Sequence, residues 1–155
     1  MTVSTLATAG GLFAIFVFVH FVVDWVFQTH DEAMAKSTNW KVRARHCAIY
    51  TLGFFPVMYF LGFSPFSFII GSAVLFFSHF VEDTYYPVFL WAKYVRKIPW
   101  LNMIDFDTGK PVPKEVSIEN FKGEFAKPLS LLLFIAIDQI IHISFLWVLV
   151  VLAMI

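Results

Sequence analysis

The chain has 155 residues, of which 59% are hydrophobic and 20 are Phe, and its formal net charge is zero. Together with a positive mean hydropathy, this composition lies outside the range of ordinary soluble domains. It therefore predicts an all-α polytopic membrane protein, with the lipid bilayer as its first partner and no nucleic acid as a ligand.

Four stretches are long and apolar enough to cross a hydrocarbon core about 30 Å thick, which takes about 20 residues of helix. They cover residues 8–28, 46–63, 65–88 and 129–155. We expect a four-transmembrane-helix bundle that forms a single domain over residues 1–155. The residues before the first stretch lack the basic charges of a removable signal peptide, so this stretch is expected to remain as a span.

The Lys and Arg residues fall in only two segments, one between the first and second spans and the other between the third and fourth. The positive-inside rule then predicts cytoplasmic loops at residues 29–45 and 89–128, with both termini on the non-cytoplasmic side. Within the second loop, residues 97–127 form a long polar stretch with aromatic residues near its start. These residues indicate either a segment lying on the cytoplasmic interface or an aromatic belt that anchors the neighbouring span.

Three aspartates within or at the edge of the spans each have a histidine four positions away. The pairs are His20/Asp24, His79/Asp83 and Asp138/His142. An i,i+4 spacing places both members of a pair on one helix face. A charge near the bilayer centre costs about 2.5 to 3.5 kcal/mol on insertion scales, so such residues usually face the bundle interior and have partners there.

The order of residues is reversed in the third pair, and so is the direction of its helix. The first and third spans run toward the cytoplasm and the fourth runs away from it. All three spans therefore place the histidine deeper than the aspartate, by about 6 Å of helical rise. His46 opens the second span near the same side, so all four helices can contribute to one layer of imidazole and carboxylate groups.

This layer is predicted to bind a divalent metal ion. Imidazole and carboxylate suit zinc first, with manganese and iron as alternatives, and the single cysteine, Cys47, is expected to be a packing residue. The ligands would be drawn from His20, Asp24, His46, His79, Asp83, Asp138 and His142. Because this set exceeds the four ligands of one zinc, either some members orient the ligating imidazoles or two metals lie side by side. Glu82 points about 100° away from Asp83, toward the interface, a lysine or a second ion.

Several of these residues also carry a resemblance: "HFVVDWVFQ" at 20–28, Lys36, His46, "HFVED" at 79–83 and "DQIIH" at 138–142. With them the chain resembles a family of small bacterial and phage integral-membrane proteins known only as a domain of unknown function. The resemblance covers the four spans and implies a bacterial inner-membrane location, but it implies no established activity. A more distant similarity of layout to inner-membrane proteins labelled as metal-dependent hydrolases is an analogy only.

Three classes of function fit these features, and the sequence assigns no catalytic residue. The first is a metal-dependent hydrolase of a lipid or another amphiphile, with metal-bound water as nucleophile and an aspartate as general base. No Ser, Cys or Lys nucleophile is expected beside the cluster, so a covalent mechanism is not expected. The second is proton or metal-ion transport, for which a homo-oligomer would supply the path across the apolar outer half. The third is a non-catalytic interaction or effector protein whose buried pairs only set helix register.

Overall fold

The structure is a computed structural model that describes residues 2–91, 94, 104–105, 110–111 and 128–155. Most of the expected loop at 89–128, and with it the expected interfacial segment, lies outside the described residues. The described part of this loop includes two short strands, β1 (Ile104–Asp105) and β2 (Lys110–Pro111). The strands pair antiparallel, with Ile104 opposite Pro111.

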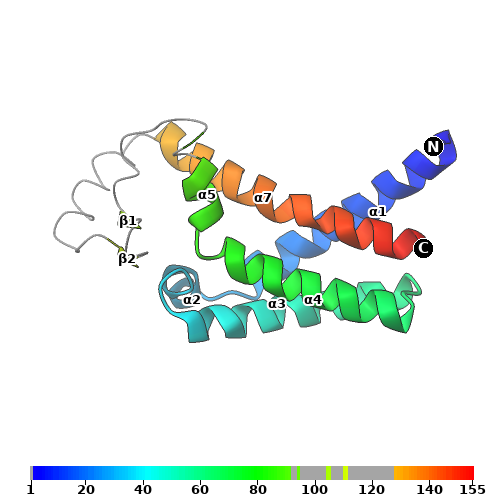
Figure 1. Cartoon of the computed structure of the whole chain (residues 1–155), viewed down its shortest axis with the longest axis horizontal. Helices are drawn as coiled ribbons and strands as arrows, with labels where there is room; N and C mark the ends of the chain where they lie inside the picture. Colours follow the sequence, from blue (N-terminus) through cyan, green and yellow to red (C-terminus); the bar gives the residue numbers. More distant parts are fainter. Residues whose placement is uncertain (1, 92–93, 95–103, 106–109, 112–127) are drawn as a thin grey trace.

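Within the described residues, four long helices make up the body of the molecule: α1 (Val3–Phe21), α3 (Trp40–Phe60), α4 (Pro65–Glu82) and α7 (Pro128–Met154). A π-helical turn, η1 (Val22–Val26), continues α1. Two short helices, α2 (His30–Ala35) and α5 (Tyr86–Trp91), lie in the connections. Both chain ends lie at one end of the bundle and α2 lies at the opposite end (Figure 1). The predicted all-helical fold class is thus confirmed.

Local sequence signals explain where the helices begin. The Asn39 side chain accepts from the backbone N–H of Lys41 at the start of α3, and Ser64 caps α4, whose first residue is Pro65. Both are favoured arrangements, because a helix start leaves backbone donors unpaired and proline has none to lose. The tight turn between α3 and α4 passes through Gly62, which has a φ of 72°. As a result, α3 and α4 are antiparallel neighbours (Figure 1).

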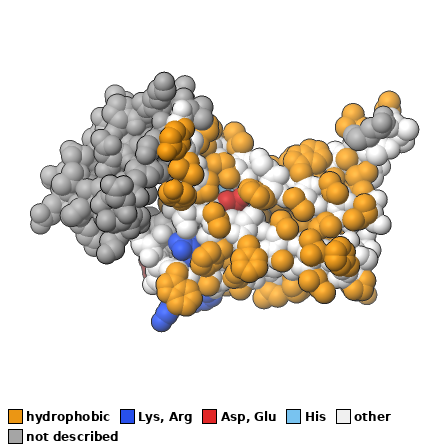
Figure 2. All heavy atoms as spheres, viewed as in Figure 1, with side chains coloured by type: hydrophobic (Ala, Val, Ile, Leu, Met, Phe, Trp, Pro, Cys, Tyr) orange, Lys and Arg blue, Asp and Glu red, His pale blue; other side chains and the backbone are white. Residues whose placement is uncertain are grey.

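Among the residues that the structure describes, three helices are long and apolar enough to cross a membrane: Val3–Val26, Pro65–Glu82 and Ile135–Met154. Hydrophobic side chains cover the visible long face of these helices (Figure 2), as expected where lipid replaces water. Phe18, for example, is 70% exposed and Phe77 is 66% exposed. The second expected span, carried by α3, is not among the three, and basic residues occupy the first turns of this helix. That α3 crosses the membrane therefore stays a prediction.

The buried apolar core lies on the side of the bundle toward the chain ends. Phe54 and Met58 follow His46 along α3, while Leu146 and Leu149 follow His142 along α7, and all four apolar side chains are almost fully buried. On the other side of this core, the interior of the bundle is polar. Apolar packing therefore holds the helices together while imidazoles and carboxylates fill the part nearer to α2.

Candidate metal centre

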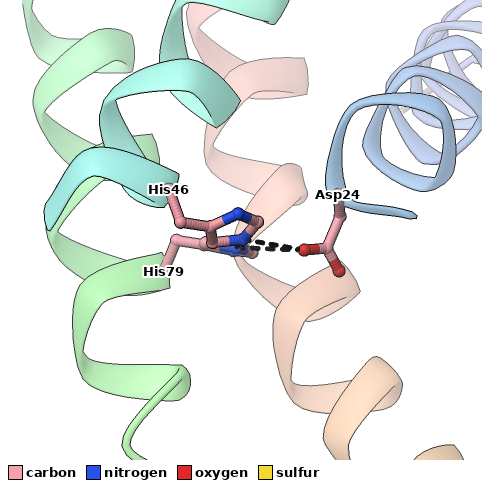
Figure 3. Close-up of side chains that lie close together, drawn as sticks. All are labelled: Asp24, His46 and His79. Atoms are coloured by element: carbon pink, nitrogen blue, oxygen red, sulfur yellow. Dashed lines mark hydrogen bonds and ion pairs between the residues drawn. The ribbon is translucent and has the colours of Figure 1, made fainter. Parts of the chain in front are cut away.

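Three buried side chains from three different elements point toward one another: Asp24 from η1, His46 from α3 and His79 from α4 (Figure 3). His46 Nε2 lies 3.0 Å from Asp24 Oδ1 and 3.0 Å from His79 Nε2, and His79 Nε2 lies 3.4 Å from Asp24 Oδ1. Ligand atoms about 2.0 to 2.1 Å from a tetrahedral zinc are about 3.3 Å apart. These atoms therefore have the mutual spacing of metal ligands, and the group could hold a metal ion.

A second group of ligand atoms lies beside the first and comprises His79, Asp83 and His142. His79 Nε2 is 3.6 Å from Asp83 Oδ2, and His142 Nε2 is 3.7 Å from Asp83 Oδ1. Asp83 Oδ2 is also 3.5 Å from His46 Nε2. Asp83 thus faces both groups, and Glu82 adds a further carboxylate with its Oε2 3.6 Å from His142 Nε2.

The position of Asp24 depends on the π-helical turn. π-helical turns are rare and often occur at functional sites. Because Asp24 lies within η1 whereas His20 lies in α1, the i,i+4 rule for an α-helix does not describe their relation. The hydrogen bonds of His20 go instead to Tyr50, whose hydroxyl is 2.9 Å from Nδ1, and to Gln139 Oε1, which accepts from Nε2 at 3.1 Å. His20 therefore lies beside the two ligand groups, with its ring 5.8 Å from that of His142.

Asp138 also lies beside the ligand groups. Its Oδ2 accepts from Gln139 Nε2 at 3.3 Å, and its backbone carbonyl accepts from His142 Nδ1 at 2.8 Å. In a neutral imidazole, a ring N–H that donates to a carbonyl leaves the other nitrogen with its lone pair. The backbone carbonyl of Asp138 thus orients the His142 ring so that Nε2 faces Glu82 and Asp83.

Lys36 is the unexpected member of the cluster. Its Nζ lies 2.8 Å from Asp83 Oδ1, 3.6 Å from Asp24 Oδ1 and 3.4 Å from His46 Nε2. Burial alone lowers the pKa of Lys36, but the carboxylates of Asp24 and Asp83 outweigh this effect and raise it above the ordinary value. The side chain is therefore an ammonium at neutral pH. A lysine thus lies beside the cluster, but a protonated, paired lysine is not the nucleophile whose absence was expected.

Hydrogen bonds hold the segment that carries Lys36 against the start of α3. Arg43 donates to the backbone carbonyls of Lys36 and Ser37 at 3.0 and 3.1 Å, and Arg45 Nε donates to Glu32 Oε1 at 3.0 Å. The Thr29 backbone N–H and the Arg45 guanidinium lower the pKa of Glu32 to about 2. The two arginines that sequence reasoning assigned only to loop charge thus position Lys36.

Tyr50 is a second residue that sequence reasoning missed. Its ring stacks on that of His79, with centroids 3.9 Å apart and planes 7° from parallel, while its hydroxyl bonds to His20. One signal was present, because Tyr50 is four residues after His46 and so shares its helix face. For Lys36 the only signal was its place among the residues that carry the family resemblance.

Fold and cluster together define a helical membrane protein with a buried set of imidazoles and carboxylates that could hold a metal ion. The chain belongs to the family described as "Protein of unknown function (DUF3307)", whose model matches residues 12–155. No curated protein and no solved structure matches the chain. Membership of an uncharacterised family is thereby confirmed, whereas the likeness to hydrolases stays an analogy.

Proposed function

We propose that this protein binds a divalent metal ion, zinc in the first place, within the membrane and uses it to hydrolyse a lipid or another amphiphile. The observation that carries the proposal is the convergence of Asp24, His46 and His79, whose ligand atoms lie 3.0 to 3.4 Å apart. Structural zinc sites use four protein ligands, whereas catalytic sites use three and keep one position for water or substrate. Three close ligand atoms favour the catalytic pattern.

The residues around this group suit hydrolysis. A metal ion bound here would supply a water of lowered pKa as nucleophile. Asp83 is the nearest further carboxylate, 3.5 Å from His46 Nε2, and in the role of general base it would accept the proton of that water. Lys36 holds the other oxygen of Asp83 at 2.8 Å, which orients the carboxylate. We assign Asp24, His46 and His79 to the metal, Asp83 to proton transfer and Lys36 to positioning.

We further propose that the α2 end of the bundle faces the cytoplasm, in a bacterial inner membrane. Among the described residues, Lys and Arg side chains gather near this end, whereas many hydrophobic side chains are spread over the visible face toward the chain ends (Figure 2). The positive-inside rule then places both chain ends on the far side and makes α3 the fourth span. In this orientation an amphiphile in the cytoplasmic leaflet would reach the cluster with its polar part.

Metal content tests the proposal directly. The full chain, purified in detergent, should carry zinc by elemental analysis, and His46→Ala or His79→Ala should lose it. His30→Ala is the matched control, because His30 is exposed and lies outside the cluster. The zinc-loaded protein should then cleave phospholipid or ester probes in mixed micelles, and the variants should not.

Each other outcome overturns a stated part of the proposal. Absence of metal in well-folded protein would end the metal proposal and favour a non-catalytic interaction protein. Stoichiometric metal without cleavage, but with zinc or proton flux in proteoliposomes, would replace hydrolysis with transport by the protein or a homo-oligomer of it.

A further inference from the structure

We propose that the group of His79, Asp83 and His142, together with Glu82 beside it, forms a second cation-binding position next to the first, so that the centre holds two divalent metal ions with Asp83 between them. This inference rests on the proposed function, because it extends the same site. It also concerns Glu82, for which the sequence left three alternatives: that its side chain faces the membrane interface, a lysine or a second ion.

The ligand atoms of this second position are close together and withdrawn from solvent. His142 Nε2 lies 3.6 Å from Glu82 Oε2 and 3.7 Å from Asp83 Oδ1. Glu82, Asp83 and His142 are each at most 3% exposed. A proton on His142 Nε2 can be donated well to only one of these two oxygens, whereas the group of His79, Asp83 and His142 could hold a metal ion.

Unpaired polar atoms point to a missing ligand at this place. Among the described residues, the buried side-chain atoms without a hydrogen-bond partner include His142 Nε2, Glu82 Oε1 and His79 Nδ1. Each such atom costs about 1 to 3 kcal/mol if nothing compensates it. Because the Asp138 carbonyl accepts from His142 Nδ1 at 2.8 Å, a neutral His142 would carry its lone pair on Nε2, which lies nearest the two carboxylates.

The charges of the cluster leave room for a second ion. Lys36 pairs with Asp24 and Asp83, and His142 lies near Glu82, Asp83 and Asp138. Four carboxylates face one ammonium; with every carboxylate ionised and every imidazole neutral the net charge would be −3, and protons that reduce this charge in the metal-free cluster would be released when metal binds. One divalent ion reduces this to −1, and buried charge that stays unpaired is costly. Two divalent ions give +1, which a hydroxide bound between them would neutralise.

Asp83 has the geometry of a ligand shared by two ions, a role that would replace the proton transfer assigned to it for a single ion. Its Oδ2 lies 3.5 Å from His46 and 3.6 Å from His79, on the side of the first group, while its Oδ1 lies 3.7 Å from His142. Two-metal hydrolytic centres hold their ions about 3.5 to 4 Å apart and use both to stabilise the attacking and leaving oxygens. Lys36 Nζ, 2.8 Å from Oδ1, would move aside when the second ion binds.

The test is metal stoichiometry on the full chain in detergent, after chelator treatment and titration with Zn²⁺ or Mn²⁺. Wild type should bind two equivalents. Glu82→Gln, which keeps the shape of the side chain, and His142→Ala should each bind one equivalent, while Asp31→Asn, at an exposed acid in α2, should keep two. Wild type loaded with Mn²⁺ should also show spin coupling between two ions in its electron paramagnetic resonance spectrum, a readout that needs no variant.

The outcomes separate this inference from the proposed function. One equivalent in wild type, unchanged in Glu82→Gln and lost in His46→Ala, would overturn the second position and leave the first, with a proton rather than a metal joining His142 to Glu82. Two equivalents that persist in Glu82→Gln and His142→Ala would place the second ion elsewhere. No bound metal in wild type would overturn both proposals.

Discussion

Replacement of Lys36 by methionine is expected to change metal affinity and metal-free stability in opposite directions. In the structure the Lys36 ammonium lies where it compensates Asp24 and Asp83, so it competes with any other cation for these carboxylates. Methionine keeps most of the length of the side chain and removes the charge together with the N–H donors. The protein without metal should therefore become less stable, whereas the metal should bind more tightly.

The distances give the size of both effects. At 2.8 Å and an effective dielectric constant of about 20, the attraction between Lys36 and Asp83 is about 6 kcal/mol before desolvation is counted. Loss of one partner of a buried ion pair costs about 3 to 5 kcal/mol in measured cases. We expect the metal-free variant to lose about 3 kcal/mol of stability. Because the competing charge is gone, the free energy of metal binding should become more favourable by a similar amount. This corresponds to a roughly 100-fold lower Kd for the metal.

Thermal unfolding in detergent with and without Zn²⁺, together with competition titration against a zinc-binding dye, measures both quantities. Lys41→Met is the matched control, because Lys41 is exposed and lies over the Trp40 ring, away from the cluster. It should leave both quantities within a few tenths of a kcal/mol. A Lys36→Met protein that binds zinc no better than wild type, or worse, would refute the idea that the ammonium and the metal compete for the same carboxylates.

Three further predictions follow from single contacts. Gly53→Ala should weaken zinc binding about 10-fold, because the added Cβ would lie 2.5 Å from Val23 Cγ2 and push η1 away from α3. Gly10→Ala is the control, because a Cβ at Gly10 meets nothing within 4 Å. Equal zinc Kd values for the two variants would contradict the reasoning. Glu32→Gln should destabilise the protein by about 1 kcal/mol at pH 7. The folded-state pKa of Glu32 is lowered from 4.5 to about 2. The difference in melting temperature between wild type and Glu32→Gln should therefore be complete above pH 4.5 and vanish as the pH falls toward 2. A difference that persists in acid would contradict this prediction. Tyr50→Phe should cost about 1 kcal/mol of stability through the lost bond to His20 but change the zinc Kd by less than about threefold, and a larger change in Kd would show that this pair takes part in binding.

The helical character and the approximate spans were readable from the sequence, because lipid requires long apolar segments whatever their neighbours are. Their ends were less predictable. The third span was expected to reach residue 88, yet α4 ends at Glu82, and the chain turns at Tyr85, which has a φ of 59°, before α5 begins. The second helix starts before the expected residue 46, because Asn39 caps it and its basic first turn is still helical.

The sequence by itself also identified the chemistry of the cluster, since an ionisable residue in an apolar helix must find a partner inside the bundle. It could not decide which histidine meets which carboxylate. Asp24 meets His46 and His79, rather than forming a hydrogen bond with His20, because a π-helical turn changes its direction and a glycine at position 53 lets η1 approach α3. Lys36 enters the cluster because α2 folds back onto α3 through Arg43 and Arg45. Such contacts depend on how helices cross and pack in three dimensions, which the spacing along one helix does not determine.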